Sequence, residues 1–66
     1  MDNTELLREL DAFLDKYGIA DSTFGVRAVG DSHVVRRIRD GRPVRRSTVL
    51  RIRQFIESHE LAVLSA

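Results

Sequence analysis

The fold follows from one arginine-rich segment in the middle of the chain, Ser32-His33-Val34-Val35-Arg36-Arg37-Ile38-Arg39-Asp40-Gly41-Arg42. Its apolar residues, two valines and one isoleucine, have the spacing of one helical face, so they predict a buried stripe. The first three arginines fall mostly on the opposite face, where they meet solvent or a partner. The segment therefore predicts a short helix over residues 32–40 that is apolar on one side and charged on the other.

Both ends of this helix carry sequence signals. Asp31 or Ser32 can accept hydrogen bonds from the free backbone N–H groups of the first turn. Gly41 readily adopts the positive φ that commonly follows the end of a helix. Guanidinium groups on a short exposed helix suit the major groove of DNA, where arginine binds guanine through two hydrogen bonds and also reaches phosphates.

The charges are segregated along the chain, although the net charge is only +1. Residues 1–26 have a net charge of −4, from six acidic residues against two basic ones. Residues 27–53 have a net charge of +7, from nine arginines against two aspartates, and residues 54–66 have −2 from two glutamates. A basic block of this kind predicts a surface that binds a polyanion, and arginine favours bidentate contacts. The alternative is a charged surface that only meets solvent.

Length and composition exclude several classes of protein. The 66 residues indicate a single domain, residues 1–66, with a small hydrophobic core. Without cysteine there is no disulfide framework or thiolate zinc site, and His33 and His59 alone make no convincing metal site. No apolar run has the length of a membrane span and no signal peptide is recognised, so we expect a soluble protein of the cytoplasm, associated with the nucleoid.

Catalysis is not expected from this chain. No Ser/His/Asp set and no pair of carboxylates falls on one inferred face, and so short a chain has little room for a catalytic cleft. We therefore predict no enzyme activity, no cofactor and no small-molecule ligand.

Two helices are predicted before the arginine-rich one. Residues 2–17 carry apolar residues at spacings of three and four, begin with a capping-box pair at Asp2 and Glu5, and end at Gly18. Residues 22–29 form a second, short helix, which Asp21 or Ser22 can cap. Its internal Gly25 lowers helix propensity, which indicates a close approach in which the backbone of another helix crosses at that point.

A last helix is predicted over residues 47–60, after a loop that contains Pro43. Ser47 can cap it, and its apolar face forms core opposite the first helix. The terminal segment 61–66 is apolar and uncharged, and either extends this helix or packs as a tail. Large apolar side chains rarely stay exposed, so we expect burial against a second copy, as a homodimer, with burial on the chain's own domain as the alternative. The dimerisation residues predicted on this basis are Leu61, Val63 and Leu64.

The middle of the chain has the pattern Phe24-Gly25-x-x-Ala28-Val29-Gly30-x-x-x-x-Val35-x-x-Ile38-x-x-Gly41. Over roughly residues 22–42 this pattern resembles the helix-turn-helix of the lambda-repressor-like, Cro and Xre-type DNA-binding proteins. That family has a small residue inside the second helix, a glycine at the turn, two aliphatic residues three apart in the recognition helix, and an I-x-x-G ending. The resemblance implies an all-α domain of four helices that binds double-stranded DNA and regulates transcription.

The resemblance also implies roles for individual residues. The base contacts fall on Ser32, His33, Arg36 and Arg37. The phosphate contacts that we predict, from the resemblance and from the exposed arginines near the recognition helix, are Ser22, Thr23, Arg27, Arg39, Arg42, Arg45 and Arg46.

Two other interpretations compete with sequence-specific DNA binding. In the first, the arginines neutralise phosphates without choosing a base sequence. In the second, the protein is a small interaction module, an adaptor or antitoxin-like subunit, whose arginine face binds an acidic protein. Single-stranded nucleic acid is less favoured than duplex DNA, because one tyrosine and three phenylalanines, mostly on helix stripes, offer no stacking platform.

Overall fold

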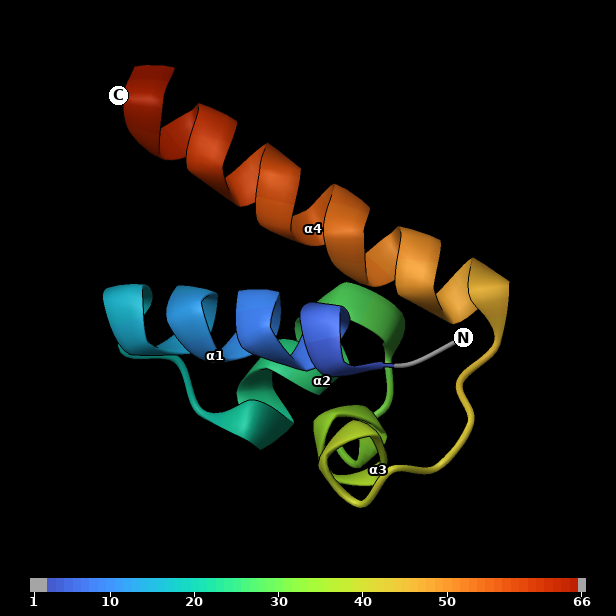
Figure 1. The fold of residues 1–66 in the computed structure, drawn as a ribbon. Helices are drawn as coiled ribbons and strands as arrows, with labels where there is room; N and C mark the ends of the chain where they lie inside the picture. Colours follow the sequence, from blue (N-terminus) through green and yellow to red (C-terminus); the bar gives the residue numbers. More distant parts are fainter. Residues whose placement is uncertain (1–2, 66) are drawn as a thin grey trace.

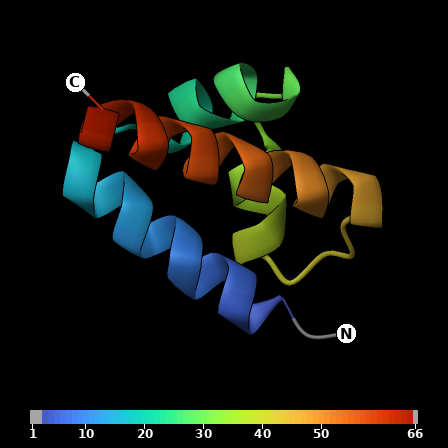
Figure 2. The same cartoon turned by 90° about the horizontal axis from the view of Figure 1, so that it is seen from above.

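A computed structural model describes residues 3–65 of the chain. It contains four helices, α1 (Thr4–Tyr17), α2 (Asp21–Val29), α3 (Val34–Arg39) and α4 (Arg46–Ser65), and no strand within those residues. The predicted all-α, four-helix class is therefore confirmed. α4 covers one side of the molecule and α3 lies on the opposite side, with α1 and α2 between them (Figures 1 and 2).

The core is entirely apolar in the described part of the chain. Phe24 lies at its centre, and its ring meets those of Phe13 and Phe55 edge-on, at centroid distances of 5.7 and 5.3 Å. Such edge-to-face arrangements are favourable because the positive edge of one ring meets the negative face of the next. The buried side chains, which include the whole predicted stripe of the arginine-rich helix, are Leu6, Leu10, Phe13, Leu14, Phe24, Val34, Val35, Ile38 and Ile52.

The end of α3 is closed by the predicted glycine. Gly41 has a φ of 76°, and the chain turns there so that the N–H of Arg42 donates to the carbonyl oxygen of Arg37 at 3.0 Å. This bond satisfies a carbonyl that would otherwise be left without a partner at the helix end. Gly18 ends α1 in the same backbone conformation, so both predicted glycine ends are confirmed.

Gly25 is the point of closest approach between α2 and the turn that follows it. Its α-hydrogen side faces the carbonyl group of Asp31 and the side chain of Val34. A Cβ at this position would overlap the Asp31 carbonyl oxygen and lie 3.1 Å from a Val34 methyl carbon. The predicted close approach is confirmed, but the predicted neighbour was wrong, because the approaching backbone belongs to the turn before α3 and not to another helix.

The predicted start of α3 was wrong by two residues. The helix begins at Val34, because residues 31–33 form a turn instead of a first helical turn. In that turn the N–H of His33 donates to the Asp31 carboxylate at 2.9 Å, which offers the backbone a local alternative to the helix. The helix also ends at Arg39, one residue before the predicted end.

Other predicted boundaries also need correction. α2 begins at Asp21 with Ala20 at the cap position, so neither Asp21 nor Ser22 caps it. α4 begins at Arg46, which puts Ser47 inside the helix, and continues to Ser65 because residues 60–65 contain neither glycine nor proline. The predicted first helix and its capping box reach Asp2, which lies outside the described residues.

Candidate nucleic-acid interface

The outer face of α3 carries exposed guanidinium groups. Val34, Val35 and Ile38 bury the inner face, so Arg36 and Arg37 project outward from a helix that is packed on its other side. The buried stripe fixes the direction of these arginines, because each lies one or two positions from Val35 and Ile38, and side chains so spaced on a helix point to different sides. This short helix lies on the side of the molecule away from α4 (Figure 1).

The other two predicted base-contacting residues adjoin this face. Ser32 and His33 are both exposed and lie in the turn immediately before α3. In helix-turn-helix proteins the N-terminal part of the recognition helix contacts base edges. The structure therefore brings the four predicted base contacts into one continuous segment at the start of α3.

Asp31 orients this segment through two hydrogen bonds. One carboxylate oxygen accepts from the backbone N–H of His33 and the other accepts from the Arg37 guanidinium, which makes an ion pair. Arg36 has no ion pair within residues 3–65. The His33 N–H and, after it, the Arg37 side chain lower the pKa of Asp31, because both stabilise the ionised carboxylate. From the sequence, Asp31 or Ser32 was predicted to cap α3, but His33 occupies the cap position and no side chain caps the helix. The pairing of Asp31 with Arg37 was missed, because a separation of six residues is not a helical pairing distance.

The pKa of Asp31 predicts a pH dependence of stability. A carboxyl group whose pKa is lowered by folding stabilises the folded state above its unfolded pKa, and the contribution is lost as the pH falls through the folded pKa. We expect Asp31→Asn, which keeps the hydrogen bond from His33 and loses the charge, to flatten the fall in Tm below about pH 4. Thermal unfolding followed by circular dichroism at a series of pH values, from neutral to acid, gives the Tm of both proteins. Parallel pH profiles for the two proteins would contradict the role of Asp31.

Arg39 faces the scaffold and is engaged by two carboxylates. Its Nε and Nη2 donate to the two carboxylate oxygens of Asp21 at 3.0 and 3.2 Å, and Nη2 also lies 2.7 Å from Asp11. These bonds raise the pKa of Arg39 and connect the end of α3 to the start of α2 and to α1. A phosphate contact from Arg39, as predicted from the sequence, requires this network to open.

The remaining arginines of the basic block divide into two groups. Within residues 3–65, Arg53 is paired with Glu9 at 3.5 Å, as Arg37 and Arg39 are with other acids. The block is not one continuous face, since Arg51 and Arg53 lie on α4, on the other side of the molecule from α3. The arginines for which the described residues provide no acidic partner are Arg27, Arg36, Arg42, Arg45, Arg46 and Arg51.

The predicted phosphate contacts occupy several places around α3. Ser22 and Thr23 are exposed in the first turn of α2, and Arg27 is exposed in its last turn. Arg42 and Arg45 are exposed in the loop after α3, and the Asn3 side-chain amide donates to the Arg42 carbonyl at 3.2 Å. Arg46, in contrast, lines a hollow beside Glu5 of α1, farther from α3.

The predicted dimerisation residues lie on the last turns of α4. Leu61, Val63 and Leu64 are exposed to 56%, 49% and 81%. Leu61 and Leu64 share one side of the helix, whereas Val63 is two positions from Leu61 and points to the other side. The three residues therefore do not form one surface.

Comparisons of the chain with protein-family models, with curated proteins and with solved structures find no match. Across residues 3–65 no helix combines the length and apolar character needed to cross a membrane. The same residues contain no group of three or more His, Asp or Glu side chains arranged to hold a metal ion.

Proposed function

We propose that this protein is a sequence-specific regulator of transcription that inserts α3 into the major groove of double-stranded DNA. The observation that carries the proposal is the division of α3 into a buried apolar side and an exposed arginine side. The major groove of B-DNA is about 12 Å wide and admits a helix. The exposed side of α3 is available for that contact because no other element of residues 3–65 covers Arg36 and Arg37.

Arg36 is the best candidate for reading a base. It is exposed, it has no acidic partner within the described residues, and it follows Ser32 and His33 at a distance of about one helical turn. An arginine in that position reaches O6 and N7 of guanine with two parallel hydrogen bonds. Arg37 can contact the DNA in two ways. It either leaves Asp31 and pairs with a phosphate or base, or it contacts a base while it stays paired with Asp31.

The base-reading role is tested by Arg36→Ala. We expect the variant to lose about 1–3 kcal/mol of binding to a site selected from random duplexes and little on unselected DNA. Electrophoretic titration on both DNAs gives the two affinities. Arg8→Ala is the matched control, because Arg8 is an exposed arginine on α1 and should leave both affinities unchanged.

Two outcomes would overturn parts of the proposal. Equal losses on both DNAs would mean that Arg36 contacts phosphate only. Phosphate contacts are strongest at low salt. Failure of the wild-type protein to bind duplex DNA at about 50 mM salt would therefore overturn DNA binding itself. It would favour the alternative of an interaction module that binds an acidic protein.

A further inference from the structure

The solvent side of α4 carries a row of residues with heptad spacing. Successive members are three and four positions apart, so they lie along one side of the helix. Each of them is exposed, and the core-facing side of α4 is formed by other residues, such as the buried Ile52. We call this set the outer row: Ser47, Leu50, Gln54, Glu57, Leu61 and Leu64.

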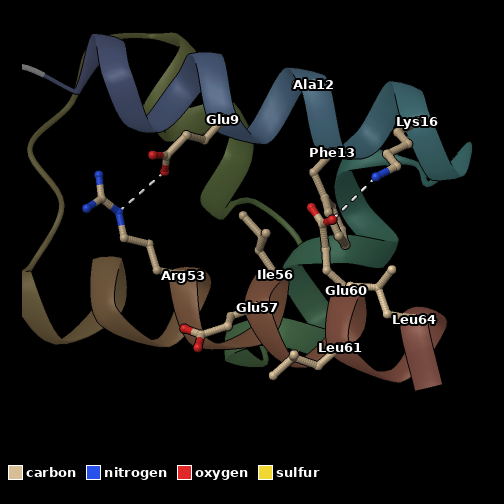
Figure 3. A pocket seen from close by; sticks show the side chains of 10 residues that line it. All are labelled: Glu9, Ala12, Phe13, Lys16, Arg53, Ile56, Glu57, Glu60, Leu61 and Leu64. Atoms are coloured by element: carbon tan, nitrogen blue, oxygen red, sulfur yellow. Dashed lines mark hydrogen bonds and ion pairs between the residues drawn. The ribbon is translucent and has the colours of Figure 1, made fainter.

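The outer row is more apolar than a free helix surface requires. Leu50, Leu61 and Leu64 are exposed to 50%, 56% and 81%, and all three lie on it. Figure 3 shows Leu61 pointing away from α1 and Leu64 pointing toward it, and both leucines border the hollow between α1 and α4. Exposed apolar side chains aligned along one helix are typical of a surface that another helix covers.

The charge pattern of α4 favours the α4 helix of a second copy as the helix that covers the outer row. Arg51 in its first half and Glu57 in its second half have no ion pair within residues 3–65, whereas Arg53 and Glu60 on the same two halves are paired with Glu9 and Lys16 of α1. Two such helices attract one another when they run antiparallel, because each basic half then faces an acidic half. A parallel pair would place Glu57 against Glu57, with repulsion between the two carboxylates.

We propose that two copies of this chain associate through the outer row, with their α4 helices antiparallel. When Gln54 lies opposite Glu57 of the second copy, Leu50 falls opposite Leu61 and Ser47 opposite Leu64. This register buries each leucine against the second helix and lets the Gln54 amide donate to the Glu57 carboxylate. Arg53, on the flank of the row and 3.5 Å from Glu9 of its own chain, also comes near Glu57 of the second copy, and Glu57 has no ion pair within residues 3–65.

The core of the contact is tested by a pair of substitutions. Leu61→Glu removes an outer-row leucine from both copies and should raise the dissociation constant of the dimer about 100-fold or more. Val63→Glu makes a comparable change at a residue that is also about half exposed but lies on the other side of α4, and should leave the dimer intact. Sedimentation of each protein from micromolar to millimolar concentration gives the mass, and circular dichroism verifies that both variants keep the helical fold.

The antiparallel register is tested by exchanging charges. Arg53→Glu and Glu57→Arg should each weaken the dimer, because each places like charges together, and the double variant should restore it. A wild-type chain that stays monomeric at millimolar concentration would overturn the proposal. So would equal dissociation by Leu61→Glu and Val63→Glu, or a double variant that is weaker than both single ones.

One consequence of this dimer rests on the proposed function. α3 and α4 lie on opposite sides of the molecule (Figures 1 and 2), so a dimer formed through α4 directs its two α3 helices away from each other. The dimer should then bridge two duplexes, which capture of a labelled duplex on an immobilised one detects. Leu61→Glu should still bind a single duplex and fail to bridge. Because sedimentation is measured without DNA, failure of the dimer and failure of DNA binding are distinguishable.

Discussion

Gly25→Ala should destabilise the protein strongly, although alanine is the better helix former. The propensity gain is about 1 kcal/mol, but the new methyl group overlaps the Asp31 carbonyl oxygen and crowds Val34. Overpacking of this kind costs about 1–3 kcal/mol and sometimes more. The clash is with backbone, which cannot swing aside as a flexible side chain does, so the turn before α3 must move.

The loss is large for a chain of this size. Domains of this length have a total stability of about 3–10 kcal/mol, and each kcal/mol lowers Tm by about 4–8 °C. We therefore expect thermal unfolding followed by circular dichroism to show a fall in Tm of about 10 °C or more for Gly25→Ala. Movement of the turn also displaces Ser32 and His33, so specific DNA binding should weaken even where the variant remains folded.

Two control substitutions separate the clash from other effects. Val26→Ala changes an exposed residue of the same helix and should leave Tm nearly unchanged. The methyl group added by Gly30→Ala has no atom within 4 Å. The variant should lose only about 1–2 kcal/mol of stability, because alanine adopts a φ of 72° less readily than glycine. A Gly25→Ala protein as stable as the wild type would show that the turn does not lie against α2 as described.

The close approach at Gly25 was predictable from the sequence, because a glycine inside a helix needs a reason. The same holds for the buried stripe Val34, Val35 and Ile38 and for the end at Gly41. These features depend on residues that are neighbours along the chain or on one helical face, and local periodicity records them. The fold class could therefore be predicted without knowing how the helices pack.

The electrostatic partners of the arginines could not be predicted in the same way. Arg39 meets Asp21 and Asp11 because α1, α2 and α3 converge, and no sequence spacing encodes that convergence. Arg37 meets Asp31 only because residues 31–33 turn before the helix starts. The net charge of residues 27–53 therefore overstates the number of unpaired arginines near α3. Some arginines of this block are paired with acids, and others lie on α4.

The sequence left the length of α4 open, and the structure shows the extended helix. Residues 60–65 have no turn signal, but their apolar, uncharged composition allowed both a helix and a packed tail. In the structure Leu61 and Leu64 border a hollow with Ala12, Phe13 and Lys16 of α1 and are still exposed to 56% and 81%. The proposed antiparallel contact would cover these two leucines.

Removing three unpaired arginines around α3 should reduce DNA affinity by the largest factor of any surface change. Arg27, Arg42 and Arg45 are exposed, lie outside the proposed base-reading segment, and have no acidic partner within residues 3–65. Each phosphate contact contributes about 0.9 to the slope of log Kobs against log salt concentration, so the triple alanine variant should have a slope shallower by about 2.7. At about 0.1 M salt this corresponds to a loss of roughly 500-fold on specific and non-specific duplexes alike.

The control is a triple variant that removes the same charge elsewhere. Arg8, Lys16 and Arg53 are exposed on α1 and α4, where Lys16 and Arg53 pair with Glu60 and Glu9 at 3.3 and 3.5 Å (Figure 3). If only total charge governs binding, both triple variants should lose affinity equally. If the phosphates lie against the α3 side of the molecule, the control variant should keep nearly the wild-type slope of log Kobs against log salt concentration. Charges farther from the phosphates than the screening length of about 10 Å at 0.1 M salt contribute little to binding. Fluorescence anisotropy titrations over a series of salt concentrations distinguish these results, and equal slopes for the two variants would refute the assignment of DNA to the α3 side.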